Sequence, residues 1–143
     1  MLAAALAAAA VAAGCSEERK CREVRREARW AVSSYLESLR PAVQDLAEQK
    51  AALEATLSRE DGVVPAEGGD PRRELAQMAQ ALPEWRKRVE AVEGVLSELE
   101  GTGPVSGDPL EVFTPRDDEV NPQAFQASRS ALQAAIDACG GQR

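Results

Sequence analysis

The stretch from Leu75 to Leu99 constrains the fold more than any other part of the chain. Apolar side chains recur there at alternating steps of three and four residues, at Leu75, Met78, Leu82, Trp85, Val89, Val92, Leu96 and Leu99. This heptad spacing places them along one face of an α-helix. Such a helix is marginal alone in water, because its apolar face must be buried against partner helices. We therefore predict that the rest of the chain supplies those helices.

The composition supports an all-helical chain and excludes several kinds of chemistry. Aromatic residues make up 3% of the 143 residues, and a core of Leu, Val and Ala suits packed helices better than sheets. The chain has no histidine, which excludes His-based triads, His general bases and the usual zinc ligand sets. Its net charge of −7 makes it a poor nucleic-acid binder. We expect no cofactor, no metal and no nucleic-acid partner.

Two long helices are predicted in the first hundred residues. The first spans residues 17–60, and Pro41 lies where the register of its apolar positions changes. Proline removes a backbone hydrogen bond, so we expect a kink near residues 37–41. The second runs from about residue 71 to residue 100, and it opens with Asp70 as the cap and a proline at the first helical position. Its heptad phase is unchanged across Pro83, which favours a kink over a turn.

A third helix is predicted to open at Asn121, which also precedes a proline, and to end at Gly140. Five of its residues share one face: Phe125, Leu132, Ala135, Ile136 and Cys139.

The connection between the second and third helices, residues 101–121, is rich in proline and glycine but carries an apolar patch of Leu110, Val112 and Phe113. Loops of this length are uncommon in small domains and are often functional, so these three side chains are candidate interaction residues. The alternative is a crossover strap whose apolar patch caps the bundle.

Residues 1–15 are apolar, carry no charged side chain and are too short to span a bilayer, but their length suits a signal peptide. They end in Val-Ala-Ala-Gly followed by Cys15, which resembles the lipobox of bacterial lipoproteins. The resemblance implies that signal peptidase II removes residues 1–14 and that Cys15 carries a diacylglycerol. The mature residues 15–143 would then form one domain, anchored to the inner or outer membrane and facing the periplasm. An ordinary cleaved signal and an uncleaved Ala-rich helix are the alternatives.

The remaining cysteines can pair if Cys15 carries a lipid. Cys21 and Cys139 are then an even pair, which exported proteins usually oxidise. The connection at residues 101–121 can span roughly 60 Å, enough for the third helix to run in the same direction as the second. Cys139 would then end beside Cys21. The alternative is two buried free cysteines.

Two charged segments also have open interpretations. Asp117, Asp118 and Glu119 form the densest carboxylate cluster in a loop, but they lack a calcium-loop pattern and are predicted to form a solvated turn. The basic run from Arg19 to Arg29 could contact anionic lipid headgroups. Alternatively, it is a solvated helix face with local ion pairs such as Glu18 with Arg22 and Arg19 with Glu23.

The sequence as a whole predicts an all-α, antiparallel three-helix bundle with long, Pro-kinked helices, a long crossover loop and a disulfide. The predicted function is that of a non-catalytic structural or protein-interaction module with a partner in the cell envelope, because no set of catalytic groups converges. The alternative is a helical periplasmic protein that binds a small apolar ligand between its helices. The oligomeric state is left open.

Overall fold

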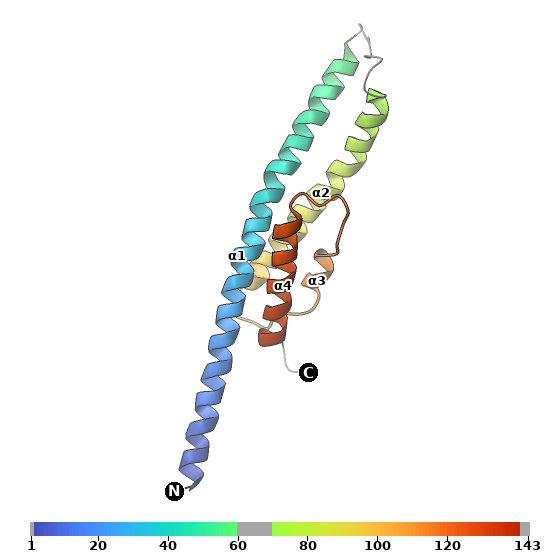
Figure 1. Ribbon diagram of the computed structural model, residues 1–143. Helices are drawn as coiled ribbons and strands as arrows, with labels where there is room; N and C mark the ends of the chain where they lie inside the picture. The colour runs from blue at the N-terminus through green and yellow to red at the C-terminus, as the bar shows by residue number, and fades with distance from the viewer. Residues whose placement is uncertain (1, 60–69, 141–143) are drawn as a thin grey trace.

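The computed structural model describes the backbone of residues 2–59 and 70–140, and the side chains from Glu17 onward within these ranges. In these ranges the chain forms four helices and no strand (Figure 1): α1 (Leu2–Ser58), α2 (Pro71–Glu100), α3 (Pro109–Val112) and α4 (Pro122–Cys139). The all-α class is therefore confirmed. The short α3 lies within the connection at residues 101–121, where no helix was predicted.

The first helix is the axis of the molecule (Figure 1). It packs against α2, which returns antiparallel to it, and against α4, which runs in the same direction as α2. The short α3 contacts α2 and α4. Cys139 at the end of α4 is joined to Cys21, and Asn121 at its start hydrogen-bonds to Ser38. The last helix thus covers α1 between residues 21 and 38.

Beyond the part that α4 covers, α1 and α2 continue as a two-helix arm (Figure 1). We define the distal arm as residues 50–58 of α1 and 71–81 of α2. Its seam is made by Leu53, Leu57, Leu75 and Met78, which are half-buried, and none of its described side chains is fully buried. The arm is therefore less enclosed than the part of the bundle that α4 covers.

The predicted helix starts are confirmed by their capping hydrogen bonds. The side chain of Asp70 accepts a hydrogen bond from the amide of Arg72 at 3.0 Å, and that of Asn121 accepts one from the amide of Ala124 at 3.1 Å. In both helices a proline occupies the first turn, where its missing N–H costs nothing. Both α1 and α2 continue through their internal prolines, Pro41 and Pro83.

The first helix begins earlier than predicted, at Leu2 instead of residue 17. Residues 2–14 are rich in alanine, the strongest helix former. The helix therefore starts within them and continues without a break into the basic run that begins at Arg19.

The buried face of α2 is rotated relative to the predicted heptad stripe. Its buried residues are Leu82, Trp85, Arg88, Val92, Val95 and Leu99, whereas Val89 and Leu96 of the stripe are only half-buried. The rotation turns Val95 and Arg88 inward. It follows from the contacts of α2, which faces α1 on one side and α3 with its flanking loops on the other.

We call residues 101–121 the strap. Two of its apolar side chains, Val105 and Phe113, are almost completely buried. The amide of Val105 donates a hydrogen bond to the carbonyl of Cys139 at 3.2 Å, which satisfies one of the free carbonyls at the end of α4. The strap therefore returns the chain to the start of α4 while filling the core beside it.

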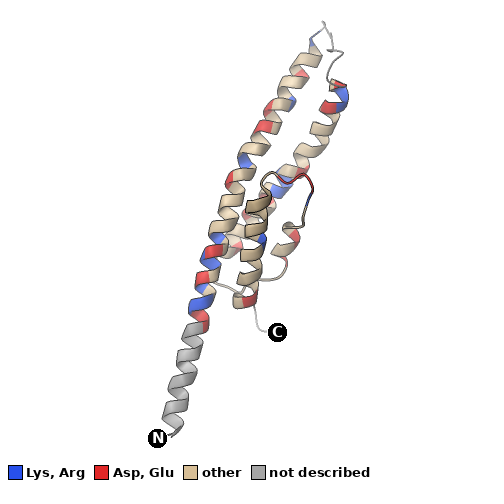
Figure 2. Ribbon diagram, viewed as in Figure 1, with Lys and Arg blue, Asp and Glu red and all other residues tan. Residues whose placement is uncertain are grey.

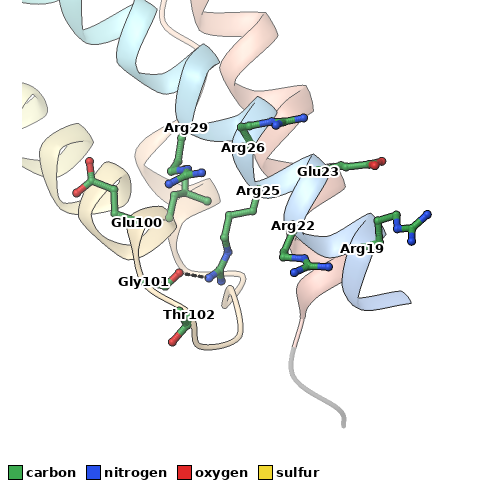
Figure 3. A pocket seen from close by; sticks show the side chains of 10 residues that line it. Arg19, Arg22, Glu23, Arg25, Arg26, Arg29, Glu100, Gly101 and Thr102 are labelled. Atoms are coloured by element: carbon green, nitrogen blue, oxygen red, sulfur yellow. Dashed lines mark hydrogen bonds between the residues drawn. The ribbon is translucent and has the colours of Figure 1, made fainter. Parts of the chain in front are cut away.

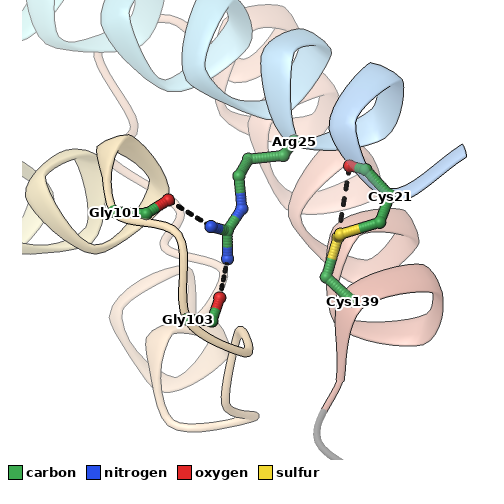
Figure 4. Close-up of a disulfide and its surroundings, with 5 residues drawn as sticks. All are labelled: Cys21, Arg25, Gly101, Gly103 and Cys139. Atoms are coloured by element: carbon green, nitrogen blue, oxygen red, sulfur yellow. Dashed lines mark hydrogen bonds between the residues drawn. A yellow bond between two sulfur atoms is a disulfide. The ribbon is translucent and has the colours of Figure 1, made fainter. Parts of the chain in front are cut away.

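Cys21 and Cys139 form the predicted disulfide, with sulfur atoms 2.06 Å apart and Cα atoms 5.1 Å apart (Figure 4). The bond joins the lower part of α1 to the last residue of α4. The predicted direction of this helix, and the role of the strap in allowing it, agree with the observed arrangement.

Candidate functional site at the disulfide-closed end

Basic residues, interspersed with acidic ones, are concentrated on α1 near the disulfide (Figure 2). Arg19, Arg22, Arg26 and Arg29 follow one another at steps of three, four and three residues, so they share one face of α1. We call these four residues the arginine face. The first three are exposed, and Arg29 is half-buried. None of the four forms an ion pair within 4 Å of another described residue, so the expected pairs of Glu18 with Arg22 and Arg19 with Glu23 are not formed.

A surface groove lies between the arginine face and the end of α2 (Figure 3). Its volume is about 470 Å³, and its lining combines the arginine face and Arg25 with two carboxylates, Glu23 and Glu100, and with the loop at Gly101 and Thr102. A second groove of about 490 Å³ shares Arg22, Arg25 and this loop with the first, and it extends past Glu17 and Glu18 to the disulfide. The two grooves therefore adjoin one another.

Arg25 behaves differently from the arginines around it, because it is buried, with 7% of its surface exposed. Its guanidinium donates hydrogen bonds to the carbonyls of Gly101 and Gly103 (Figure 4). These carbonyls follow the C-terminus of α2, where the helix dipole favours a cation. Arg25 thus fixes the start of the strap to α1. In the sequence Arg25 belongs to the basic run, but its spacing from Cys21 and Ala28 places it on the inward face and could have indicated its burial.

Trp30 directly follows Arg29, the last residue of this basic segment, and 75% of its surface is exposed. The other tryptophan, Trp85, has 7% of its surface exposed and packs in the core. A large aromatic side chain that contributes nothing to the core is a candidate contact residue.

A buried polar cluster lies further along the bundle and joins three segments. Glu119 of the strap accepts hydrogen bonds from the hydroxyl of Tyr35 on α1 and from Nη2 of Arg88 on α2, the latter at 3.0 Å. Nε of Arg88 also donates to the Tyr35 hydroxyl oxygen at 3.0 Å. Only 9% of the Arg88 side chain and 4% of the Glu119 side chain are exposed. The three polar groups therefore satisfy one another away from water.

Aromatic rings enclose this cluster. The rings of Tyr35, Phe113 and Phe125 lie 5.7 to 5.8 Å apart, and the Arg88 guanidinium carbon lies 5.2 Å from the centre of the Phe125 ring. Burial and the hydrogen bond to Glu119 raise the pKa of Tyr35 above its usual value, since both disfavour the phenolate. The arrangement holds α1, α2, α4 and the strap together.

The structure places the predicted interaction residues mainly inside the molecule. Phe113 is fully buried, whereas Leu110 and Val112 are half-buried and pack against the core. In this arrangement Phe113 offers no surface to a partner, and the patch fits the interpretation of a strap that caps the bundle. The predicted lipidation residue, Cys15, lies outside the described side chains.

The predicted solvated turn at residues 117–119 is wrong for Glu119, which is buried beside Arg88 because the strap turns it toward α2. Asp118 is exposed, and Arg116 donates two hydrogen bonds to it, at 3.0 and 3.2 Å, which lower the pKa of its carboxyl group. Within the described ranges, no group of three or more acidic or cysteine side chains is placed to hold a metal ion.

The described residues define an all-α protein that a disulfide closes at one end. Comparison of the chain with protein-family models, with curated proteins and with solved structures gives no match. Over the part of the chain that the structure describes, no helix has the length and apolar character that crossing a bilayer requires.

Proposed function

We propose that the chain is a bacterial envelope lipoprotein, anchored by a lipid on Cys15, and that it acts as a non-catalytic interaction module. The observation that carries this proposal is the disulfide between Cys21 and Cys139. Stable disulfides belong to oxidising compartments such as the periplasm. Their use of two of the three cysteines leaves Cys15, the residue of the lipobox-like segment, as the odd one.

The proposed anchor and the distal arm lie at opposite ends of α1. Cys15 is six positions before Cys21 at the closed end, whereas the arm begins near residue 50 (Figure 1). In this proposal α1, α2 and α4 are the three helices of the predicted antiparallel bundle, and α3 is a turn within its crossover. An anchored bundle of this kind presents its arm, at the end of α1 remote from the anchor, to a partner in the envelope.

The contacts of the buried cluster support the view that its polar groups stabilise the fold and do not take part in catalysis. Both oxygens of Glu119 accept hydrogen bonds, one from Tyr35 and one from Arg88. The alternative of an apolar ligand between the helices would require the space filled by Phe113 and Phe125 to open. We therefore favour the interaction module.

The anchor is tested by separating membranes from soluble proteins in cells that express the native chain, C15S, or C21S/C139S. We expect acyl chains on the native chain and on C21S/C139S, which should stay in the membrane fraction through a high-salt wash, and no acyl chain on C15S. The intact mass of the native chain should equal that of residues 15–143 plus acyl chains, and should rise by two hydrogens on reduction. A native chain without acyl chains, or a C15S variant that still carries them, would contradict the proposal.

The interaction is tested by photo-crosslinking from the distal arm. A photoreactive residue at Thr56, which is exposed on the arm, should give a discrete product with one envelope protein. The matched position is Gln133, which is exposed on α4 near the closed end. Products that are the same from both positions, or that are absent from Thr56, would argue against the arm as the contact surface.

A further inference from the structure

We propose that the arginine face and Trp30 form a docking surface for an anionic phospholipid bilayer, on which the lower part of α1 lies obliquely. This inference rests on the proposed function, since it assigns a role to the segment that directly follows the lipid anchor.

The charge of this surface is not neutralised within the protein. The four arginines of the arginine face form no ion pair with another described residue. Glu23 lies beside the arginine face, four residues after Arg19 and three before Arg26, and it lines the groove with them. Together with Glu27 it leaves the segment from Arg19 to Arg29 with more basic than acidic side chains. The chain as a whole has a net charge of −7, so this local excess of positive charge opposes the overall balance. An anionic surface is its natural complement.

The shape of the surface suits phosphate groups. Arg22 and Arg25 extend toward the loop at Gly101 and Thr102, whereas Arg19 and Arg26 extend outward from α1 (Figure 3). Guanidinium groups bind phosphate oxygens in a bidentate manner, and the adjoining groove is wide enough for a headgroup. Arg25 is engaged by carbonyls of the strap, so it supports the groove wall while its exposed neighbours remain free to bind.

Trp30 extends this surface with an apolar contact. It follows Arg19 and Arg26 by eleven and four residues, which places the three side chains on one line along the helix. The indole ring prefers the boundary between headgroups and acyl chains, where its ring is shielded and its N–H stays hydrated. This preference explains why a side chain with 75% of its surface exposed is found opposite the core.

The distance from the anchor determines the orientation. Arg19 to Trp30 follow Cys15 by 4 to 15 residues on the same helix, so they lie about 6 to 22 Å from it along the axis. If α1 stood upright, only Arg19 of the arginine face would lie within the screening length of about 8 Å. Contact by Arg26 and Trp30 therefore requires the helix to tilt toward the bilayer.

The test uses residues 15–143, the mature chain of the proposal, with Cys15→Ser and in oxidised form, so that binding depends neither on an acyl chain nor on the apolar residues 1–14. Its sedimentation with vesicles of phosphatidylcholine and phosphatidylglycerol is compared with that on phosphatidylcholine alone. R19Q/R22Q/R26Q should lower the partition coefficient roughly 100-fold, at about fivefold for each arginine near the surface. The matched control, R72Q/R73Q/R86Q, removes the same charge from exposed positions of α2 and should change it less than about twofold.

Tryptophan fluorescence gives a second reading. Trp85 is already buried, so a blue shift on vesicle binding should come from Trp30 and should vanish in W30F. Equal binding of the two triple variants, or equal binding to both kinds of vesicle, would overturn the inference even if the native chain is acylated. Vesicle binding that depends on the arginine face in a protein whose native form lacks acyl chains would instead contradict only the proposed anchor.

Discussion

Tyr35 is the only tyrosine of the chain, and its hydroxyl group lies in the core between a carboxylate and a guanidinium. Each group of this cluster is costly to bury alone, and the three become tolerable only because their hydrogen bonds are complete. At the residue scale, the position of the strap thus depends on Glu119 being paired. Two measurements can isolate this dependence.

The first measurement is an alkaline titration of the phenol. Because the pKa of Tyr35 is raised in the folded chain, the phenolate absorbance should stay low above pH 10, the usual pKa, and should appear only as the protein unfolds. The folded state then holds this proton more tightly than the unfolded state. The stability that this tighter proton binding adds is fully present below about pH 10. The free energy of unfolding should fall as the pH rises above that value. A reversible ionisation near pH 10 with the fold intact would contradict this expectation.

The second measurement compares Glu119→Gln with Glu84→Gln. The first substitution leaves Arg88 buried without its charged partner, so we expect a loss of about 3 kcal/mol in urea unfolding. The second removes a partner of Arg116 at 3.7 Å, where 59% of the Glu84 side chain is exposed, and should cost less than about 1 kcal/mol. Similar losses in both variants would mean that the buried pair has no special role.

The sequence could not predict this cluster. A helical pattern assigns charged residues to the surface, so the predicted stripe includes Val89 and not its neighbour Arg88. Arg88 pairs with a residue 31 positions away, and Tyr35 bonds to one 84 positions away. Such pairs depend on the tertiary path of the strap, which no local pattern contains. The same applies to Arg25, whose acceptors are carbonyls 76 and 78 positions away.

At the scale of the elements, small side chains let α4 approach α1 closely. Ala28 and Ala31 on α1 face Ser128 and Ala135 on α4, and all four are buried. The hydroxyl of Ser128 donates to the carbonyl of Ala31 at 2.9 Å, so the two helices meet with little room between their backbones.

This contact predicts that a larger side chain at Ser128 separates the helices. Ser128→Leu should lower the free energy of unfolding by about 1 to 3 kcal/mol, because the added atoms overfill a closely packed interface. Ser130→Leu places the same side chain at an exposed position of the same helix and should change stability by less than about 0.5 kcal/mol. If Ser128→Leu were as stable as the wild type by thermal unfolding, the close approach would be wrong.

Element boundaries were predictable where side chains mark them. Asp70 and Asn121, each followed by a proline, fixed the starts of α2 and α4 because a cap is a local interaction. The start of α1 was not marked in this way, since the helix begins in the Ala-rich segment at Leu2 and continues through residues 14–20. The four residues of α3 are too few to show a period.

For the whole molecule, the disulfide and the strap together fix the direction of α4. The bond joins two cysteines that are 118 positions apart in the sequence, and so closes nearly all of the described chain into one loop. The cysteine count and the length of the connection were enough to predict this topology, because they constrain the path of the chain and not its detailed packing. Which side chains of the strap enter the core was a matter of packing, and it could not be read from composition.

Removing the disulfide should therefore destabilise the chain mainly through its unfolded state. We expect C21S/C139S to lose about 3 to 5 kcal/mol in urea unfolding, because a loop of this length restricts the unfolded chain strongly. Its helix content by circular dichroism should stay close to that of the wild type. Reduced wild-type protein is the matched control and should lose a similar amount. A variant as stable as the oxidised protein would show that the bond contributes nothing to folding.

The same bond changes what a protease can do to the molecule. Residues 21 to 139 form a covalent ring, so one cut in any loop between them opens the ring but releases no fragment. The disulfide holds the two pieces together until a second cut or a reductant separates them. Loss of material from the parent molecule would then require two independent events, and a nicked chain would keep its α1 and α4 side by side.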